Sequence, residues 1–514
     1  MNSCREGEKR AGLLSKFACA AGSMKVGKGD RMKLSEYASF DGLGLAELIR
    51  KGEVTSSELT TAAFEAIDAV NDKIFAVVGR IDPPSADHRA HPSAPFHGVP
   101  FVIKDLWHGW GGVRCDQGSR LGEGYVYPRD GQLAARFKRG GLVAVARSAT
   151  SELGLFMGVR GVSGEYTRNP WNPALSPGAS SGGSAAAVAA GIVPLGHAND
   201  GGGSIRMPAA WCGLTGLKPS RGRNPLVAPP VGDGPYGVCA HHVVTRTVRD
   251  LAAALDISSG PTGGDYIPLA RPQRTFLEEV SVEPGRLRIA LCTRLPEANA
   301  PDAICIEAAL SVAKLCEELG HHVEQAAPTI SYKQTVEVCY DWYTMATYTS
   351  IEEMARNSGK IPSAENLEQP SLATYKKGKT MSATHLTHRL DEATRMSLMM
   401  GEFMRQYDII LTPATSRAAP PIEDIRVERF GDGDLSYWWE EGEYYTFMPL
   451  FSVTGQPAMV LPLYWTADEL PLGVQFSAAI GNEGVLFRLA GQLEQARPWN
   501  RRRPRIHASS THGA

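Results

Sequence analysis

The chain has 514 residues, of which 43% are hydrophobic, and its formal net charge is −2. A chain of this length can bury a large core, about three quarters of its unfolded surface, while the near-neutral charge provides no global field to attract nucleic acid or anionic lipid. No run of 18 apolar residues occurs, so we expect no transmembrane span and neither a nucleic acid nor a membrane as a partner.

The spacing of the cysteines and histidines predicts free, reduced thiols and no metal site. The nine cysteines are scattered singly with no CxxC pair, which is typical of free thiols in a cytoplasmic protein. The histidines show no HExxH or similar ligand spacing, so no metal site is expected.

Length would allow about three domains, yet no linker divides the chain. Residues 1–31 are interpreted as a disordered extension, 32–505 as one domain and 506–514 as a tail. The short basic cluster at 497–505 is interpreted as solvated, with a binding patch as the alternative.

Helix and strand signals alternate through the first half of the chain. Thr55 and Glu58 form a capping-box pattern ahead of apolar residues at helical spacing, and residues 101–103 are apolar on both faces, as in a strand covered on both sides. Lys104 lies at the end of that strand. It is either a residue of a cleft or a surface lysine whose aliphatic stem packs on the protein while its charged end reaches water. Further strands are predicted at 75–78, 142–146 and 192–195, and helices at 131–139 and 184–190.

The alternation continues beyond residue 240. Thr247 and Asp250 predict a capped helix, residues 287–291 a strand, and 301–319 a helix with proline at its start and glycine after its end. Strands and turns return after residue 409, including the segments FSVTGQPAMVLPL and PLGVQF. The pattern predicts an α/β fold with a mixed β-sheet core covered by helices on both faces.

Between about 330 and 450 the chain is rich in helix and in aromatic residues. Aromatic side chains most often serve packing, but their concentration away from the sheet also fits the wall of a substrate pocket. The candidates for that wall are Trp342, Tyr343, Trp438 and Trp439.

Residues 176–223 contain two glycine-flanked serine sites. The glycines at 201–203 carry no Cβ that would shield their backbone N–H groups, and Ser204 follows on a turn that we expect to open a helix. The segment could therefore hold an oxyanion beside a nucleophile, or it could be a flexible turn with a capping serine. Residues 178–182 also match the G-x-S-x-G elbow, but that motif needs a preceding strand, and 172–177 reads as a loop.

Taken together, these segments resemble the amidase signature family. In that family the nucleophile is the serine of a GGS[IV]R segment, 24 residues after a serine in a cis-peptide geometry; Ser204 and Ser180 have this spacing. The family lysine of a G-V-P-x-x-x-K-D segment is matched by Lys104. The resemblance spans about residues 37–499 and is nearest to bacterial amidases of the 6-aminohexanoate cyclic-dimer hydrolase type, which share an RNPWN lead-in and a HGND-like stretch, here HAND at 197–200.

The resemblance implies an amide hydrolase that works through an acyl-enzyme without cofactor or metal. Ser204 would attack the carbonyl, Ser180 would relay the proton, and Lys104 would be the base. The oxyanion would be held by the backbone N–H groups of Gly201, Gly202, Gly203 and Ser204. A lysine base requires a pKa lowered from about 10.4 toward about 7 to 8, which burial achieves by penalising the charged form.

Neighbouring residues are expected to support this machinery. Asp200 and Arg206 would brace the nucleophile turn by a charge-assisted hydrogen bond, and Ser181 would hydrogen-bond within the relay. Asp105 should point away from the lysine, since its charge would oppose the shift. Gly201 stands where the family more often has a bulkier residue such as threonine, so we expect an oxyanion loop open to wider substrates.

The expected partner is a small or oligomeric amide, with esters or carbamates as further substrates and a homodimer as one option for assembly. The alternatives are a non-catalytic binding protein on the same fold, a Ser–His–Asp hydrolase that would use a histidine such as His197, and a glutamyl-tRNA amidotransferase A-type subunit.

Overall fold

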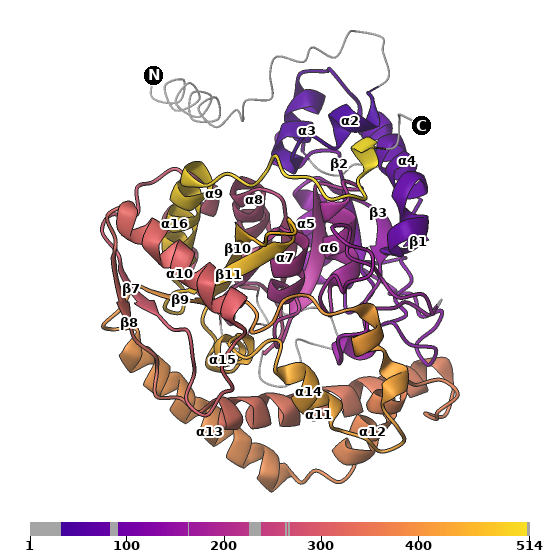
Figure 1. The fold of residues 1–514 in the computed structure, drawn as a ribbon. Coiled ribbons are helices and arrows are strands. Elements are labelled where there is room, and N and C mark those ends of the chain that lie inside the picture. The colour runs from indigo at the N-terminus through magenta and orange to yellow at the C-terminus, as the bar shows by residue number, and fades with distance from the viewer. Residues whose placement is uncertain are drawn as a thin grey trace.

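The computed structural model describes residues 32–82, 91–162, 164–225, 238–262, 265 and 268–510. The extension predicted at 1–31 lies outside the described residues. The described chain forms one large mixed sheet of 11 strands in the order β1-β3-β2-β4-β6-β5-β10-β11-β9-β7-β8 (Figure 1).

The strands span nearly the whole sequence. Their bounds are β1 Val77–Arg80, β2 Val99–Lys104, β3 Leu142–Ser148, β4 Leu195–Asp200, β5 Thr215–Lys218, β6 Ala240–Thr245, β7 Arg288–Leu291, β8 His322–Gln325, β9 Ile409–Pro413, β10 Ala458–Trp465 and β11 Pro471–Ser477. β2 pairs in parallel with both β3 and β4, whereas β4 pairs antiparallel with β6.

Helices connect and cover these strands. Their bounds are α2 Leu34–Tyr37, α3 Gly42–Arg50, α4 Ser56–Ile74, α5 Gln132–Arg139, α6 Gly182–Ala189, α7 Arg206–Cys212, α8 Val248–Ser258, α9 Phe276–Glu279, α10 Ala303–Glu318, α11 Tyr332–Ser358, α12 Gln369–Gly378, α13 Ala383–Phe403, α14 Tyr437–Gly442, α15 Met448–Thr454 and α16 Glu483–Ala496. The predicted capping box at α4 is confirmed, because Thr55 Oγ1 accepts from Glu58 N at 3.2 Å and Glu58 Oε2 accepts from Thr55 N at 2.7 Å.

Neighbouring residues of β4 show that helices cover both faces of the sheet. Gly196 faces α6, because a Cβ there would meet Ser184 and Val188 at 3.3 and 3.4 Å. The next side chain, His197, lies against the Phe137 ring of α5, with ring centroids 6.3 Å apart. Successive residues of a strand point to opposite faces, so α6 and α5 lie on opposite sides of the sheet, as predicted.

Two predicted elements were placed wrongly. The strand expected at 192–195 is β4, which begins at Leu195, because Pro194 has no N–H for a ladder and buried polar residues in β4 hide the apolar pattern. The segment expected to continue as strand and turn from Phe451 starts within helix α15, which has a proline in its first turn and is capped by Gly455 with φ 89°. Tertiary packing overrides the β-propensity of Phe and Val there.

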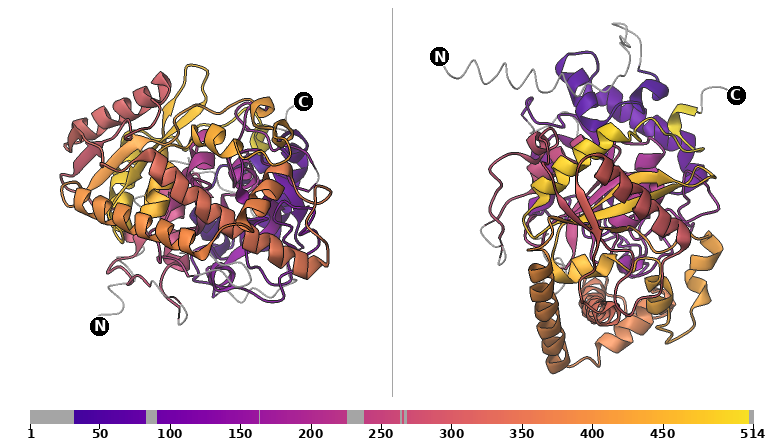
Figure 2. Two further views of the ribbon diagram at one scale, coloured as in Figure 1. Left: turned by 90° about the horizontal axis from the view of Figure 1, so that it is seen from below. Right: turned by 60° about the vertical axis from the view of Figure 1, so that its left-hand side comes forward.

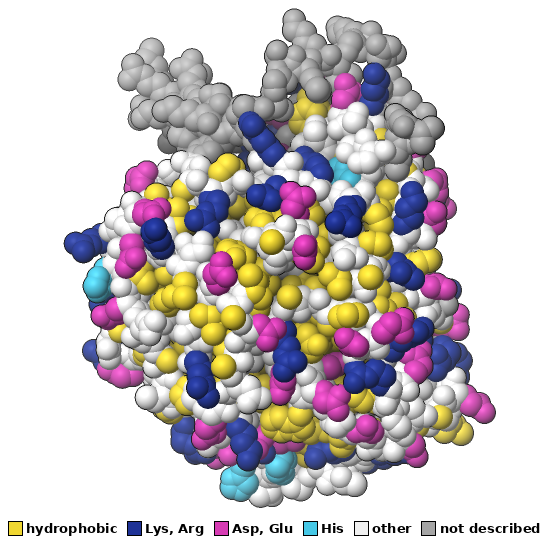
Figure 3. Space-filling view, in the orientation of Figure 1, with side chains coloured by type: hydrophobic (Ala, Val, Ile, Leu, Met, Phe, Trp, Pro, Cys, Tyr) yellow, Lys and Arg dark blue, Asp and Glu magenta, His cyan; other side chains and the backbone are white. Residues whose placement is uncertain are grey.

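The long helices lie together at one end of the sheet. Figures 1 and 2 show α11, α12 and α13 grouped below the strands with α14 beside them, and a second hydrophobic cluster with Trp342, Met396 and Phe451 binds this group to the rest. On the face seen in Figure 3, positive and negative side chains are interspersed. None of the described helices is long and apolar enough to cross a bilayer, and the seven described cysteines are free thiols.

The C-terminal segment differs from the tail expected at 506–514. His507 and Ala508 are buried, and Ala508 N donates to Ala190 O at 2.8 Å. The segment therefore packs onto the domain as far as Ser510, where the described residues end.

Candidate active site

The site forms where two neighbouring parallel strands end. β2 ends at Lys104 and β4 at Asp200, and Val102 of β2 lies opposite Gly196 of β4. The carboxyl ends of parallel neighbours meet at one edge of a sheet, where α/β proteins place their ligands. Lys104 and the turn after Asp200 are thereby brought together although nearly a hundred residues separate them.

Lys104 lies at the buried centre of this site. Its side chain is 0% exposed, and Nζ lies 2.7 Å from Ser180 Oγ and 2.5 Å from Asn199 Oδ1. Burial lowers the pKa of Lys104 to about 7, while nearby negative charges oppose this shift. A substantial fraction of the amine is therefore uncharged near neutral pH, the state that a base requires.

Asn199 is a site residue to which the sequence analysis assigned no role. Its Nδ2 donates to Leu106 O at 3.1 Å, which orients the amide so that Oδ1 faces Lys104. The signal that could have revealed it is its position next to the end of a strand that adjoins β2.

The two serine segments meet at the start of α6. The peptide bond between Ala179 and Ser180 is cis. Ser181 N donates to Ser204 O at 3.3 Å, and Ser181 Oγ donates to Asn199 O, also at 3.3 Å. Ser181 therefore ties the segments together through their backbone rather than by contacting the Lys104 amine.

Asp200 organises the turn that carries Ser204. Asp200 Oδ1 accepts a hydrogen bond from Gly203 N at 2.7 Å, so this N–H group points at the carboxylate. Of the four oxyanion donors expected from the sequence, Gly203 is thereby removed, because one N–H group directed at Asp200 does not also serve a substrate. Gly201, Gly202 and Ser204 remain as candidate donors.

Arg206 holds Asp200 from the other side, as expected. Both residues are 0% exposed, and Arg206 donates from Nε and Nη2 to the two carboxylate oxygens at 2.8 and 2.9 Å. Its Nη1 reaches Met448 O and Gln475 Oε1, each at 2.9 Å, and Nη2 reaches Ser452 Oγ at 3.0 Å. Burial raises the pKa of Asp200, but the Arg206 charge and hydrogen bonds prevail and the pKa is lowered overall.

We expect Arg206→Met to destabilise the protein by about 3–5 kcal/mol, because it leaves the Asp200 carboxylate buried and unpaired. Urea unfolding or calorimetry measures the change. The matched control is Arg288→Met, which breaks the exposed pair with Asp408 and should have a far smaller effect. Equal losses from the two variants would contradict the bracing role of the buried pair.

The space beside Gly201 is filled rather than open. A Cβ at Gly201 would clash with the hydroxyl oxygen of Tyr343, so the tyrosine occupies the position where a bulkier residue would extend. The expectation that Gly201 widens the oxyanion loop is therefore wrong, because α11 supplies a ring in place of the missing side chain.

Ser204 and Ser180 line one pocket between the sheet edge and the helical region. Ser204 is 9% exposed. The pocket is lined by Gly154, Leu155, Phe156, Met157, Ala179, Ser180, Gly202, Gly203, Ser204, Met207, Cys339, Tyr343, Trp438, Glu441 and Tyr445. No histidine is among these residues, and His197 is instead buried against His241, with Nε2 and Nδ1 3.2 Å apart. This arrangement disfavours the Ser–His–Asp alternative.

Two of the four aromatic residues expected in the pocket wall line this pocket. Tyr343 and Trp438 do, whereas Trp342 is buried in the second hydrophobic cluster and Trp439 is 42% exposed, in a separate surface depression. Helical geometry explains the split. Side chains three or four apart share a face and adjacent ones do not.

The same spacing identifies pocket residues that the sequence analysis missed. Cys339 lies four residues before Tyr343 on α11, and Glu441 lies three residues after Trp438 on α14; all four line the pocket. The periodicity was visible in the sequence, but nothing there indicated which helical face would meet the serines.

Asp105 points away from Lys104, as expected. Asp105 Oδ1 accepts from Arg147 Nη1 at 2.8 Å and from Asp116 N at 3.1 Å. Burial nevertheless raises the pKa of Asp105 to about 7, with the Arg147 charge opposing. The carboxyl group therefore forms part of an ion-pair network with Arg147 and Asp116, and in the described part of the chain no acid forms a salt bridge with Lys104.

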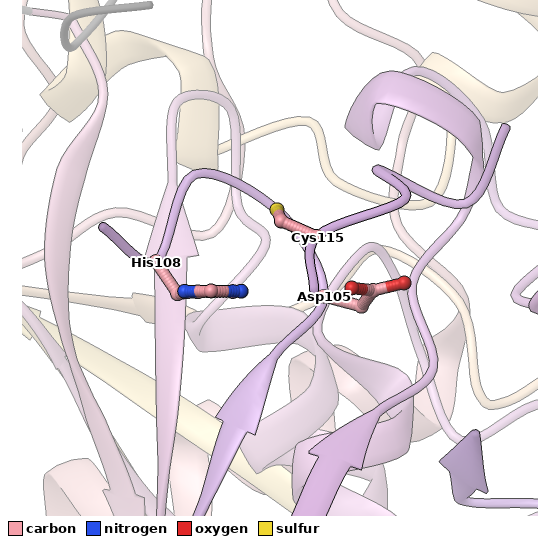
Figure 4. Close-up of side chains that lie close together, drawn as sticks. All are labelled: Asp105, His108 and Cys115. Atoms are coloured by element: carbon pink, nitrogen blue, oxygen red, sulfur yellow. The ribbon is translucent and has the colours of Figure 1, made fainter. Parts of the chain in front are cut away.

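Asp105, His108 and Cys115 lie close together in the loop that follows β2 (Figure 4), with potential ligand atoms within 4.8 Å of one another. However, His108 Nδ1 accepts from Trp110 N at 2.9 Å, and its Nε2 lies 3.1 Å from Arg114 O, to which it can donate. Both nitrogens are therefore used within the loop. The donor set does not fit a metal ion, which needs an available imidazole lone pair.

Comparisons with known proteins agree with this geometry. The family model described as Amidase matches residues 58–487. A 6-aminohexanoate-cyclic-dimer hydrolase of Paenarthrobacter ureafaciens is 33% identical over 479 residues, covering 91% of this chain and 96% of that protein. The solved structure of a 6-aminohexanoate cyclic dimer hydrolase complexed with substrate has a TM-score of 0.85 at 31% identity, covering 91% of this chain and 99% of the other.

A more distant match concerns the amidotransferase alternative. The A-type subunit of glutamyl-tRNA(Gln) amidotransferase from Thermotoga maritima has a TM-score of 0.71 at 25% identity, covering 93% of this chain and 98% of the other. Its likeness is weaker than that of the cyclic dimer hydrolase in both measures. On the match over residues 58–487 and on the relatives that span nearly their full length, the chain belongs to the amidase family.

Proposed function

We propose that this amidase hydrolyses the C–N bond of small or oligomeric amides through an acyl-enzyme on Ser204. The observation that carries the proposal is the 2.7 Å contact between Lys104 Nζ and Ser180 Oγ, in a pocket that Ser204 also lines. A buried amine of lowered pKa beside two hydroxyl groups is suited to activate a serine nucleophile.

Lys104 contacts Ser180, and both serines lie in one pocket; the proposed reaction adds a hydrogen bond from Ser204 Oγ to Ser180 Oγ, which forms when the substrate binds. Uncharged Lys104 takes the Ser180 proton while Ser180 takes the proton of Ser204, and Ser204 Oγ forms a bond to the carbonyl carbon. The N–H groups of Gly201, Gly202 and Ser204 would hold the oxyanion. The C–N bond then breaks as the relay returns a proton to the departing nitrogen, and water releases the acid by the same path. Esters and carbamates pass through similar intermediates and are expected as further substrates.

The apolar lining of the pocket favours aliphatic acyl chains. Phe156, Tyr343 and Trp438 line it beside the serines, so an extended aliphatic acyl chain would be buried among apolar surfaces. The names of two relatives give 6-aminohexanoate cyclic dimer, an amide with aliphatic chains, as the substrate. Oligomers of such units are therefore the first substrates to test. We expect the protein to work in the cytoplasm.

Light scattering on the purified chain distinguishes a monomer from a homodimer.

The test is a panel of amides offered to the purified lone chain, with release of amine as the readout. It contains an aryl anilide, an aliphatic amide, 6-aminohexanoate cyclic dimer, an ester and a carbamate. We expect turnover of at least one amide and formation of a fluorophosphonate adduct on Ser204. Turnover by the lone chain would exclude an amidotransferase subunit that requires a partner protein for activity. Folded protein that forms no adduct and cleaves no amide would instead support the non-catalytic alternative.

A further inference from the structure

Glu441 is a buried carboxyl group in the wall of the catalytic pocket. It lies on α14, is 5% exposed, and lines the same pocket as Ser180 and Ser204. Its neighbours in the lining include Phe156, Met157 and Trp438, which are mainly apolar. The relay from Lys104 through Ser180 to Ser204 does not use this acid, so its presence there calls for a different explanation.

The hydrogen bonds of Glu441 are incomplete. Oε2 accepts from Met157 N at 2.8 Å, which ties α14 to the loop beside Ser180. Among the described residues, no group donates a hydrogen bond to Oε1, although that atom is buried. Leaving a buried polar atom without a partner costs about 1–3 kcal/mol, so the fold carries an unfavourable contact at a position that faces substrate.

No cation among the residues that the structure describes forms an ion pair with the Glu441 carboxyl group. The Arg429 charge acts on it, but the Arg429 guanidinium lies 3.8 Å from Glu440 and also donates to Asp424 O. Burial raises the pKa of Glu441 to about 8, so near pH 7 much of the group is protonated on Oε1, the oxygen that does not accept from Met157 N. A cation or N–H group that binds there favours the ionised form, in which Oε1 is an acceptor. A donor that entered the pocket would therefore meet an acceptor already held in place by Met157 N.

We propose that Glu441 binds a nitrogen-bound hydrogen of the substrate at a position away from the scissile bond. The ligand group is either an ammonium or a second amide N–H, both of which occur in amino-acid amides and their oligomers. An ammonium would form an ion pair with the carboxylate in an apolar setting, and an amide N–H would donate to Oε1. The proposal rests on the amidase function above and adds the chemical class of substrate that the pocket selects.

Three p-nitroanilides test the proposal: 6-aminohexanoyl, heptanoyl, which matches it in length, and 6-acetamidohexanoyl, which is longer by an acetyl group. The heptanoyl compound replaces the ammonium by a methyl group and retains the same scissile bond. The variants are Glu441→Gln, which preserves shape and can still accept from Met157 N, and Glu441→Leu. The control is Glu440→Gln, the same change at the adjacent exposed position of α14.

Wild type should favour the 6-aminohexanoyl or the 6-acetamidohexanoyl anilide over heptanoyl by at least about tenfold in kcat/KM, the worth of a hydrogen bond to a charged or buried group. The substrate that is favoured identifies the source of the hydrogen. Both Glu441 variants should reduce this ratio to within about threefold. Glu441→Gln, which can still accept from Met157 N, should leave heptanoyl turnover nearly unchanged, and Glu440→Gln should keep the wild-type ratio.

The possible failures are distinct. If no anilide is cleaved in a Ser204-dependent manner, the proposed amidase function fails. If heptanoyl anilide is cleaved but wild type shows no preference for a nitrogen-bearing chain, or if the preference survives in both Glu441 variants, the role of Glu441 is overturned. Loss of heptanoyl turnover together with the preference would show that Glu441 serves only to brace the Met157 loop, and would also overturn the proposal.

Discussion

Ser204→Ala should lower kcat on every cleaved amide by at least about 10⁴-fold, because the variant loses the atom that forms the acyl-enzyme. Stopped-time assays of amine release measure this loss. Fluorophosphonate labelling should disappear in parallel, and the melting temperature should change little, since Ser204 Oγ takes part in none of the hydrogen bonds found among the described residues.

The matched control for this loss is Ser181→Ala. Ser181 lies in the same cluster but hydrogen-bonds to Asn199 O and, through its backbone, to Ser204 O. Removal of the Ser181 hydroxyl should disturb only the positions of the two serine segments. It should therefore lower kcat far less than removal of the Ser204 hydroxyl. A Ser204→Ala enzyme that retained more than about one hundredth of wild-type kcat would exclude Ser204 as the nucleophile.

Lys104→Met should lower kcat/KM by about 10²–10⁴-fold, the usual contribution of a positioned general base. The pH profile gives a second and independent reading. Burial lowers the pKa of Lys104 to about 7, and only the uncharged amine accepts a proton. Wild-type kcat/KM should therefore rise about tenfold per pH unit below about pH 7 and level off above it, and this limb should be absent in the variant.

Lys218 offers a matched control for the base. It is also buried with a pKa lowered to about 7 by burial, but its Nζ donates to Pro219 O at 2.8 Å rather than to a serine. Lys218→Met should keep the acid limb of the profile, whatever it does to stability. A limb that vanished in Lys218→Met and persisted in Lys104→Met would assign the titration to the wrong lysine and overturn the mechanism.

The reacting groups could be predicted from local patterns. The covered strand at 101–103 delivers Lys104 to a sheet edge, and the spacing of Ser180 and Ser204 matches a family motif, so three separate segments of the sequence indicate the same chemistry. The Asp200–Arg206 pair was predicted for the same reason. Each of these features depends on residues that are close in sequence or on strand ends whose location follows from topology.

The pocket wall could not be predicted in this way. Trp439 and Trp438 are adjacent and chemically identical, yet one is exposed and the other lines the pocket, because α14 turns only one face toward the serines. Likewise, nothing in the sequence distinguishes Gly203 from the two glycines before it. The conformation of the folded turn directs its N–H group at Asp200.

The resemblance of short motifs to the amidase signature family thus sufficed to predict a lysine, two serines and their charged brace in an α/β fold, since each motif consists of residues close together in the sequence. Which donors remain for an oxyanion, how Tyr343 fills the space beside Gly201, and why a carboxyl group lies at Glu441 depend on contacts between α11, α14 and the sheet edge. Those contacts join residues far apart in the sequence, and their geometry is set by packing of whole helices rather than by any local pattern.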